Sequence, residues 1–254
     1  MGRIKRDEII GFIEHNIQMF YGNRLNKLMK LKLGELLKRK NPYLFKAKYI
    51  ITAPELVKTI LDAYLSSQEE GIFGGFLEEL AIFICGKVYN GKKSSAEGIE
   101  LEFNKEDIKY LVSIKSGPNW GNSRQVQKMK DDFKHAIKIL STNTPRHKID
   151  AICGCCYGKD KNPDKGEYQK LCGQQFWKFI SGDESLYVDI IEPLGNKAKE
   201  KNERFNIEYA KVVNKFTMQF AINFCDFDGN ILWEKLVKYN SAKESDLKIR
   251  PLPK

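Results

Sequence analysis

Two short runs near the middle of the chain follow an apolar–polar alternation with a period of two. They are residues 99–103, IELEF, and residues 110–115, YLVSIK, with the polar residues 104–107 between them. This period is typical of strands with one buried face, and a polar cluster of this length favours a hairpin turn. The sequence therefore predicts an antiparallel strand pair over residues 99–115.

The alternation also assigns faces, because side chains alternate along each strand and a hairpin matches like face to like face. One face collects Ile99, Leu101, Phe103, Tyr110, Val112 and Ile114; the other collects Glu100, Glu102, Lys109, Leu111, Ser113 and Lys115. Glu100 and Lys115 thus converge, which suits a divalent-metal phosphodiesterase centre. The alternative is a solvated strand face, where Glu102 opposite Lys109 is a surface pair worth only about a few tenths of a kcal/mol.

Apolar residues at helical spacing predict helices on both sides of this strand pair. The expected helices cover residues 9–20, 25–37, 52–65, 76–87, 124–140, 171–180 and 198–221 and a terminal segment around Trp233. The glycine-punctuated residues 71–75 are expected to precede the fourth helix, and residues 92–96 to form a polar connection. Residues 149–157 predict another strand, whereas 186–191 fit either a strand or a helix. The expected fold class is α/β, with a mixed central β-sheet flanked by helices and an N-terminal helical region.

Composition narrows the choice of partner. The chain has 254 residues, 42% of them apolar, and Lys and Arg outnumber Asp and Glu by 43 to 33, with a sequence pI near 9.1. This balance favours a polyanionic partner, with nucleic acid first and an anionic membrane surface second. No stretch approaches the roughly 20 apolar residues of a membrane span. Cysteines inside apolar runs and the lack of a secretion signal predict free thiols in the cytoplasm.

Two segments carry side chains suited to DNA contact. The loop after Lys115 combines amides, an indole and an arginine, which suit base edges better than a simple turn requires. Its candidate contacts are Ser116, Asn119, Trp120, Asn122, Arg124 and Gln125. The expected helix over 25–37 and the residues after it form a lysine-rich segment that includes Lys38 and Arg39. This segment would either follow a phosphate backbone or form a solvated face, and the sequence favours neither interpretation over the other.

The helix expected over residues 76–87 offers a second acid. On a helical wheel Glu79 lies at the flank of the apolar stripe, whereas Glu78 points away. A flanking carboxylate can reach a site beside the core, so Glu79 is the candidate. The alternative is an ordinary surface glutamate.

The layout of helix, Glu, strand pair, x-Lys, helix and strand resembles the PD-(D/E)XK nuclease superfamily. Four runs extend the likeness over most of the chain: KNPYLF at 40–45, GFLEE at 75–79, SIKSGPN at 113–119 and FW at 176–177. They are similar to type II restriction endonucleases, particularly those cutting GGNCC-type interrupted palindromes. The resemblance implies a restriction-endonuclease-like core over residues 69–254 and places dimerisation and DNA contact in the helical region 1–68.

The resemblance also implies roles for particular residues. Glu100 takes the place of the first metal-binding acid, and Lys115 matches the motif lysine. Ser113 stands where the second acid is usual, and a hydroxyl is a poor Mg²⁺ ligand. The missing carboxylate would come from Glu79, from Asp131 or Asp132, or the site is impaired; Glu79 is favoured, with the backbone carbonyl of Ile114 as a further ligand. Glu97 is the alternative to Glu100, although strand parity puts Glu97 on the apolar side.

The implied activity is Mg²⁺-dependent cleavage of double-stranded DNA at a specific short palindromic or pseudopalindromic site, with Mn²⁺ as a substitute cofactor. Water would attack the phosphate and leave a 5′-phosphate. The implied partners are a second copy of the chain, as a homodimer on palindromic DNA, and a DNA methyltransferase acting on the same site. Two alternatives stay open: a structure-specific or repair nuclease, and a catalytically inactive DNA-binding relative suggested by Ser113.

Overall fold

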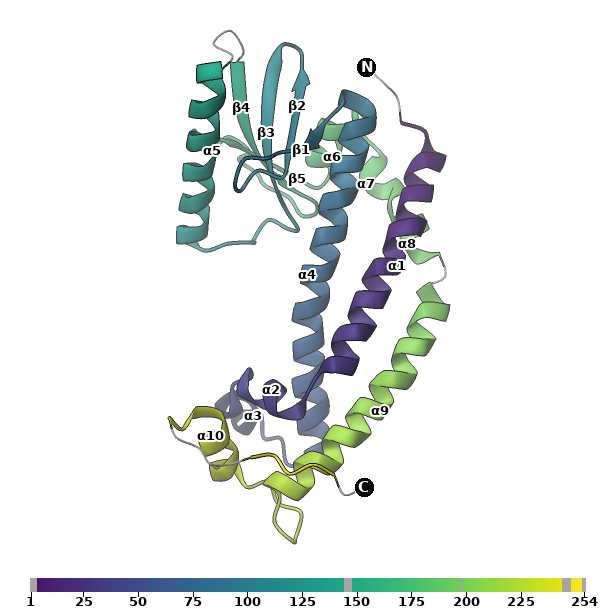
Figure 1. The fold of residues 1–254 in the computed structure, drawn as a ribbon, viewed down its shortest axis with the longest axis vertical. Helices are drawn as coiled ribbons and strands as arrows, with labels where there is room; N and C mark the ends of the chain where they lie inside the picture. Colours follow the sequence, from purple (N-terminus) through teal and green to yellow (C-terminus); the bar gives the residue numbers. More distant parts are fainter. Residues whose placement is uncertain (1–3, 144–147, 197, 244–247, 253–254) are drawn as a thin grey trace. The chain divides into compact units, whose positions relative to one another are not determined.

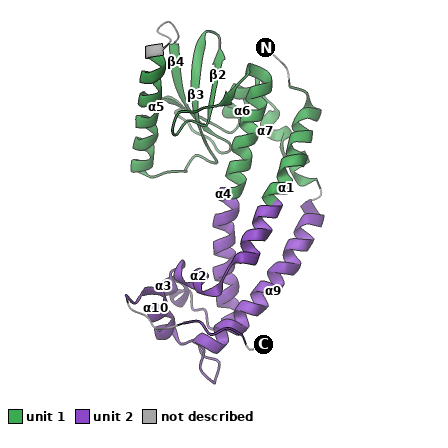
Figure 2. Cartoon of the chain, viewed as in Figure 1, with its two compact units in different colours: residues 1–20, 72–196 green, residues 21–71, 197–254 purple. Residues whose placement is uncertain are grey.

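The computed structural model describes residues 4–143, 148–196, 198–243 and 248–252. The chain forms two compact units (Figure 2): unit 1 comprises residues 1–20 and 72–196, and unit 2 comprises residues 21–71 and 197–254. The C-terminal helices therefore belong with residues 21–71. The expected division into 1–68 and 69–254 instead grouped them with the nuclease core.

Unit 1 is built on a five-stranded sheet with the order β1-β2-β3-β4-β5 (Figure 1). The strands are β1 (Lys92–Lys93), β2 (Leu101–Lys105), β3 (Ile108–Lys115), β4 (Lys148–Cys155) and β5 (Gln169–Cys172). Strands β1 to β3 pair antiparallel, whereas β3, β4 and β5 are parallel neighbours. The sheet is mixed and flanked by helices, which confirms the predicted fold class.

The hairpin between β2 and β3 turns at Glu106 and Asp107, inside the polar cluster that predicted it. Both residues have positive φ, 53° and 62°. Two successive left-handed residues match the right-handed twist of the flanking strands. The register that follows pairs Leu101 with Val112 and Phe103 with Tyr110, which confirms the predicted face of these residues. Ile99, which precedes β2, was assigned to the same face but packs instead in the buried cluster that contains Leu111.

Helices cover both faces of the sheet. On one face, α5 (Ser123–Asn143) packs Met129 and Phe133 against a buried cluster that includes Leu111. On the other face, Phe179 of α6 (Gln174–Ser181) contacts the rings of Phe103 and Tyr110. Short helices α7 (Leu186–Asp189) and α8 (Ile191–Gly195) follow α6. Their helical form settles the segment that the sequence left open.

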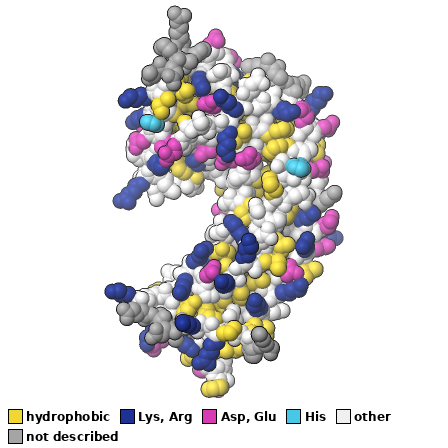
Figure 3. All heavy atoms as spheres, viewed as in Figure 1, with side chains coloured by type: hydrophobic (Ala, Val, Ile, Leu, Met, Phe, Trp, Pro, Cys, Tyr) yellow, Lys and Arg dark blue, Asp and Glu magenta, His cyan; other side chains and the backbone are white. Residues whose placement is uncertain are grey.

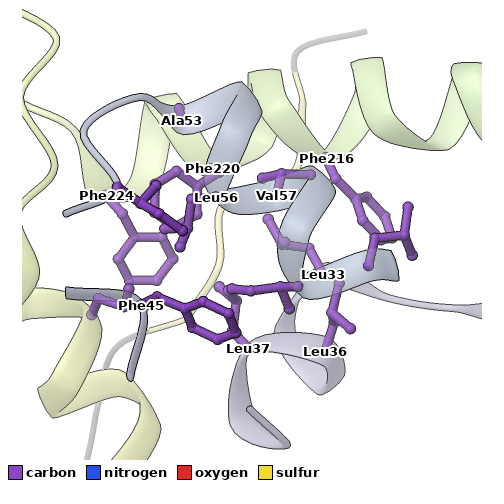
Figure 4. Packing of buried hydrophobic residues seen from close by; sticks show 14 of the residues in the cluster. Leu33, Leu36, Leu37, Phe45, Ala53, Leu56, Val57, Phe216, Phe220 and Phe224 are labelled. Atoms are coloured by element: carbon purple, nitrogen blue, oxygen red, sulfur yellow. The ribbon is translucent and has the colours of Figure 1, made fainter. Parts of the chain in front are cut away.

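Unit 2 is helical and has its own apolar core, drawn in Figure 4. Besides parts of α1 (Arg6–Lys30) and α4 (Ala53–Tyr89), it contains α2 (Leu33–Lys38), α3 (Pro42–Ala47), α9 (Ala198–Phe224) and α10 (Trp233–Ser241). Buried members of the cluster come from helices far apart in the chain, including Leu36, Leu56 and Phe220. Figure 3 shows charged side chains on the visible face of each unit.

Two predicted helix boundaries are wrong. The expected helices over 9–20 and 25–37 are largely one helix, α1, followed by the short α2. The expected break at residues 71–75 is absent because α4 runs unbroken through Gly71, Gly74 and Gly75. A helical glycine costs about 1 kcal/mol relative to alanine, and buried residues on both sides of this segment outweigh that cost.

Two short strands were also missed. The expected polar connection over 92–96 contains β1, and the expected helix over 171–180 begins later because residues 169–172 form β5. All six cysteines lie in the described residues and are free thiols; Cys225 is partly exposed and the other five are buried. Among the described residues, no helix combines the length and apolar character needed to cross a membrane.

Candidate active site

The centre of the candidate site is an acidic and a basic side chain from neighbouring strands. Glu100 immediately precedes β2, and its N–H donates to the carbonyl of Val112 at 3.0 Å, so it continues the β2–β3 ladder. Its Oε1 lies 3.5 Å from Nζ of Lys115, at the end of β3, and both side chains are 21% exposed. The predicted convergence of Glu100 and Lys115 on one side of the sheet is confirmed.

Further contacts hold this pair in place. Oε2 of Glu100 accepts a 2.7 Å hydrogen bond from the backbone N–H of Ile114. The ammonium of Lys115 lies 5.2 Å from the ring centroid of Trp120, within the range of a cation–π contact. Trp120 is partly buried against the cluster under α5. The ring expected to contact DNA therefore also positions Lys115.

Ser113, which replaces the usual motif acid, is completely buried, and its Oγ has no hydrogen-bond partner. Its register partner is Cys153 on β4. A buried hydroxyl without a hydrogen-bond partner lowers the folding stability, because its desolvation is not compensated. Ser113 lies on β3, between β2 and β4, two residues before Lys115 and on the same face of the strand.

The structure separates the two acids on α4. Glu78 has a 27% exposed side chain, whereas the side chain of Glu79 is 57% exposed. Burial raises the pKa of the Glu78 carboxyl above its ordinary value of 4.5, and the negative charge of Glu100 raises it further. Glu78 is thus the α4 acid that shares the electrostatic environment of Glu100. The helical wheel instead predicts that Glu78 points away from the core and that Glu79 lies beside it.

The remaining candidate acids are engaged elsewhere. Glu97 has an 83% exposed side chain and pairs with Lys128 at 3.0 Å. Asp132 pairs with the same ammonium at 3.0 Å, and Asp131 accepts a hydrogen bond from Gln127. Of the two alternatives on the first strand, Glu100 is the one beside Lys115.

The loop over residues 116–122 is held against the segment that follows β4. A Cβ on Gly117 would lie 2.2 Å from the ring of Tyr157, so any larger residue there would have to displace that ring. The N–H of Tyr157 donates to the carbonyl of Ser116 at 3.2 Å, and Nζ of Lys170 donates to the carbonyl of Pro118 at 2.9 Å. This part of the loop is therefore presented in a fixed conformation.

The amides expected to read DNA first serve the helix that follows them. The N–H of Asn122 donates to Oε1 of Gln125, and the N–H of Gln125 donates to Oδ1 of Asn122, at 2.9 and 3.1 Å. This reciprocal pair is a capping box at the start of α5. Asn119 and Arg124 are exposed, while Lys38 and Arg39 are exposed residues of unit 2. Their contacts with DNA stay predictions.

The donor set fits a divalent cation. Mg²⁺ takes oxygen ligands and is usually held by one or two carboxylates plus waters and substrate phosphate. Glu78 and Glu100 supply two carboxylates. The pKa of Glu78 is raised first by burial and then by the charge of Glu100, and a bound cation would offset both effects. Within the described residues no group of three His, Cys, Asp or Glu side chains could hold a metal by itself.

A mixed sheet flanked by helices, with Glu100 and Lys115 meeting where β2 pairs with β3, is the architecture of the restriction-endonuclease-like proteins. The family model described as Type II restriction endonuclease EcoO109I matches residues 7–202. The chain belongs to this family and is therefore a DNA-binding nuclease of the type II restriction endonucleases. A comparison with curated proteins finds no match.

Two residues of the site escaped the sequence reasoning. Lys93 of β1 approaches both α4 acids, with its Nζ 3.5 Å from Oε1 of Glu78 and 3.3 Å from Oε1 of Glu79. A two-residue strand gives no detectable period, so the facing direction of Lys93 could not be read from the sequence. The helical wheel predicts that Glu78 points away from the site. A wheel describes angles around one helix only and contains no information on the strands beside it.

Proposed function

We propose that the chain is a Mg²⁺-dependent endonuclease that cuts both strands of DNA at a short palindromic or pseudopalindromic site and leaves 5′-phosphates. Mn²⁺ would replace Mg²⁺. The observation that carries the proposal is the Glu100–Lys115 pair beside Glu78, in a chain of the EcoO109I family. The resemblance of its motifs to enzymes that cut GGNCC-type sites makes an interrupted palindrome the proposed target.

In this mechanism Glu78 and Glu100 would hold the cation. When bound, Mg²⁺ supplies Lewis-acid polarisation of the scissile phosphate and lowers the pKa of the attacking water. Lys115 orients that water and takes part in moving its proton, while Glu100 and Trp120 fix the ammonium. Ser113, with its buried hydroxyl, serves as a spacer under the site and leaves the ligand role to Glu78.

A palindromic target requires two copies of the site, so we propose a homodimer whose two-fold axis coincides with that of the DNA. Such an enzyme acts in the cell beside a methyltransferase that protects the same sequence. Light scattering of the full chain, alone and with an oligonucleotide duplex, tests the dimer. A monomer in both samples contradicts it.

The direct test is digestion of a plasmid of known sequence with Mg²⁺, with Mn²⁺ and with a chelator. We expect discrete fragments with either metal, none with the chelator, and one sequence shared by all ends. A smear would point to a nuclease without sequence preference. An intact plasmid, un-nicked even with Mn²⁺, would identify an inactive relative in which Ser113 has ended catalysis.

The isosteric variants Glu78→Gln and Glu79→Gln form a matched pair for the second ligand. Each removes one charge from adjacent positions of α4. We expect the Mg²⁺ concentration for half-maximal cleavage to rise much more in Glu78→Gln than in Glu79→Gln, since only Glu78 shares the environment of Glu100. The reverse order would restore Glu79 as the ligand.

A further inference from the structure

Strand β1 places its two lysines against different acids. Nζ of Lys92 lies 3.2 Å from Oε1 of Glu102, whereas Nζ of Lys93 lies between Glu78 and Glu79. Consecutive residues of a strand point to opposite faces, so the two lysines share neither partner nor face. Lys93 is thus the residue of β1 that meets the candidate metal ligand.

The charges around Lys93 are unbalanced. Glu78, Glu79 and Glu100 carry three negative charges when ionised, against the two positive charges of Lys93 and Lys115. Glu78 is the more buried acid on α4 and Glu79 is the more exposed one. The Lys93 ammonium therefore has two acceptors within 3.5 Å, of which Glu78 alone shares the environment of Glu100.

A divalent cation on Glu78 and Glu100 would compete with Lys93 for the same carboxylate. An ammonium and a dication a few ångströms apart repel each other, so Lys93 opposes binding as long as it stays on Glu78. Glu79 offers a second carboxylate on the same helix, and the Lys93 ammonium already donates a hydrogen bond to its Oε1 at 3.3 Å. Lys93 therefore stays paired when it leaves Glu78.

We propose that Lys93 is a positioning residue that bridges Glu78 and Glu79 in the metal-free protein and keeps only Glu79 when a divalent cation binds at Glu78. This inference rests on the proposed function, because it assumes the cation at Glu78 and Glu100. It gives Glu79 a defined role as the acceptor that keeps Lys93 paired, without contact to the metal.

The test measures Mn²⁺ binding to the full chain without DNA, at fixed pH and ionic strength, from the free Mn²⁺ signal in electron paramagnetic resonance. We expect Lys93→Met to bind Mn²⁺ roughly three- to tenfold more tightly than the wild type, because one repelling charge is gone. The matched control Lys92→Met removes the same charge from an exposed lysine that pairs with Glu102 and not with Glu78, and it should change the affinity by no more than about twofold. Lys93→Arg keeps the charge and should bind like the wild type.

A double-mutant cycle separates the release of Glu78 by Lys93 from general electrostatics. Glu79→Gln should weaken Mn²⁺ binding several-fold when Lys93 is present, because the ammonium then stays on Glu78. In the Lys93→Met background the same change should cost no more than about twofold. Equal losses in both backgrounds, or equal effects of Lys93→Met and Lys92→Met, would overturn the role of Lys93.

A failure of the proposed metal centre gives a different set of Mn²⁺ affinities from a failure of the role of Lys93. If Glu78→Gln and Glu100→Gln bind Mn²⁺ as tightly as the wild type, no cation binds at these acids, and both the proposed mechanism and the role of Lys93 are overturned. If those two variants lose binding while the Lys93 variants behave like the wild type, the metal centre stands and the inference about Lys93 alone is rejected.

Discussion

Each unit contains a partly buried cluster of charges, and the two clusters differ in balance. In unit 2, the guanidinium of Arg24 pairs with Glu69 and donates a hydrogen bond to Oδ1 of Asn202. Its Cζ lies 3.5 Å from the ring centroid of Phe205. One cation there meets one anion. In unit 1, two acids lie near each other, and the charge of Glu100 helps to raise the pKa of Glu78.

The difference in charge balance suggests different roles for the two clusters, one in stability and one in the candidate active site. A balanced ion pair with additional hydrogen bonds and a stacked ring has no charge left for a ligand, so we assign the Arg24 cluster to the stability of unit 2. An excess of negative charge in unit 1 costs folding free energy, and in the proposed mechanism a bound cation would offset it. Substitutions in the two units should accordingly affect different measurements.

The largest expected effect is on cleavage, in Lys115→Met. Loss of the group that we propose to orient the attacking water should lower the rate by about 10²- to 10⁴-fold, while specific DNA binding is kept. Lys109→Met is the matched control, since Lys109 lies on the same face of β3 and pairs with Glu102. Single-turnover cleavage and a gel-shift assay measure the two properties. Loss of binding together with cleavage would assign Lys115 a structural role.

The next effect is on stability, in Phe220→Ala of unit 2. Phe220 is completely buried beside Phe224, and its truncation should cost about 3–5 kcal/mol of unfolding free energy. Phe227→Ala makes the same change at a fully exposed ring and should cost almost nothing. Urea unfolding followed by circular dichroism measures both. Similar losses in the two variants would show that the core in Figure 4 does not stabilise unit 2.

A smaller loss is expected for Arg24→Met, which leaves Glu69 unpaired at a partly buried position. The cost should be about 1–3 kcal/mol of unfolding free energy, without any change in Mn²⁺ affinity. Arg6→Met is the control, because Arg6 and Glu192 form an exposed pair worth at most about 1 kcal/mol. A change in Mn²⁺ affinity in Arg24→Met would contradict the division of roles between the clusters.

The smallest effect is a dependence of stability on pH. The pKa of Glu78 is higher in the folded protein than its ordinary 4.5, so the folded state binds more protons above pH 4.5. Its contribution to stability is complete below that pH and is lost as the pH rises through the raised pKa. The stability of metal-free wild type relative to Glu78→Gln should therefore fall over this interval. A difference that stays constant or increases would reject the raised pKa.

The central pair was within reach of the sequence because it depends on local geometry alone. A period of two and one polar turn determine which side chains of a hairpin share a face, so Glu100 and Lys115 could be brought together from residues 99–115. Glu78 and Glu79 could not be distinguished in this way. Their difference depends on how α4 lies against Glu100 and β1, which is a tertiary contact.

The missed boundaries have the same origin. Gly74 and Gly75 suggest a break when judged by propensity, but α4 continues because its apolar side is buried on both sides of them. In the loop before α5, by contrast, the same residues fit two interpretations, DNA contact and helix capping. Asn122 and Gln125 have the composition of a base-reading segment, and their spacing of three is also that of a capping box.

The distribution of the thiols offers a handle for spectroscopy. Cys225 is partly exposed and the other five cysteines, all within the described part of the chain, are buried. A maleimide dye should thus attach first at Cys225, and Cys225→Ser would give a background with slow labelling in the native state. A single cysteine introduced at Asn119 would then carry a fluorophore on the exposed loop and report the arrival of a duplex directly.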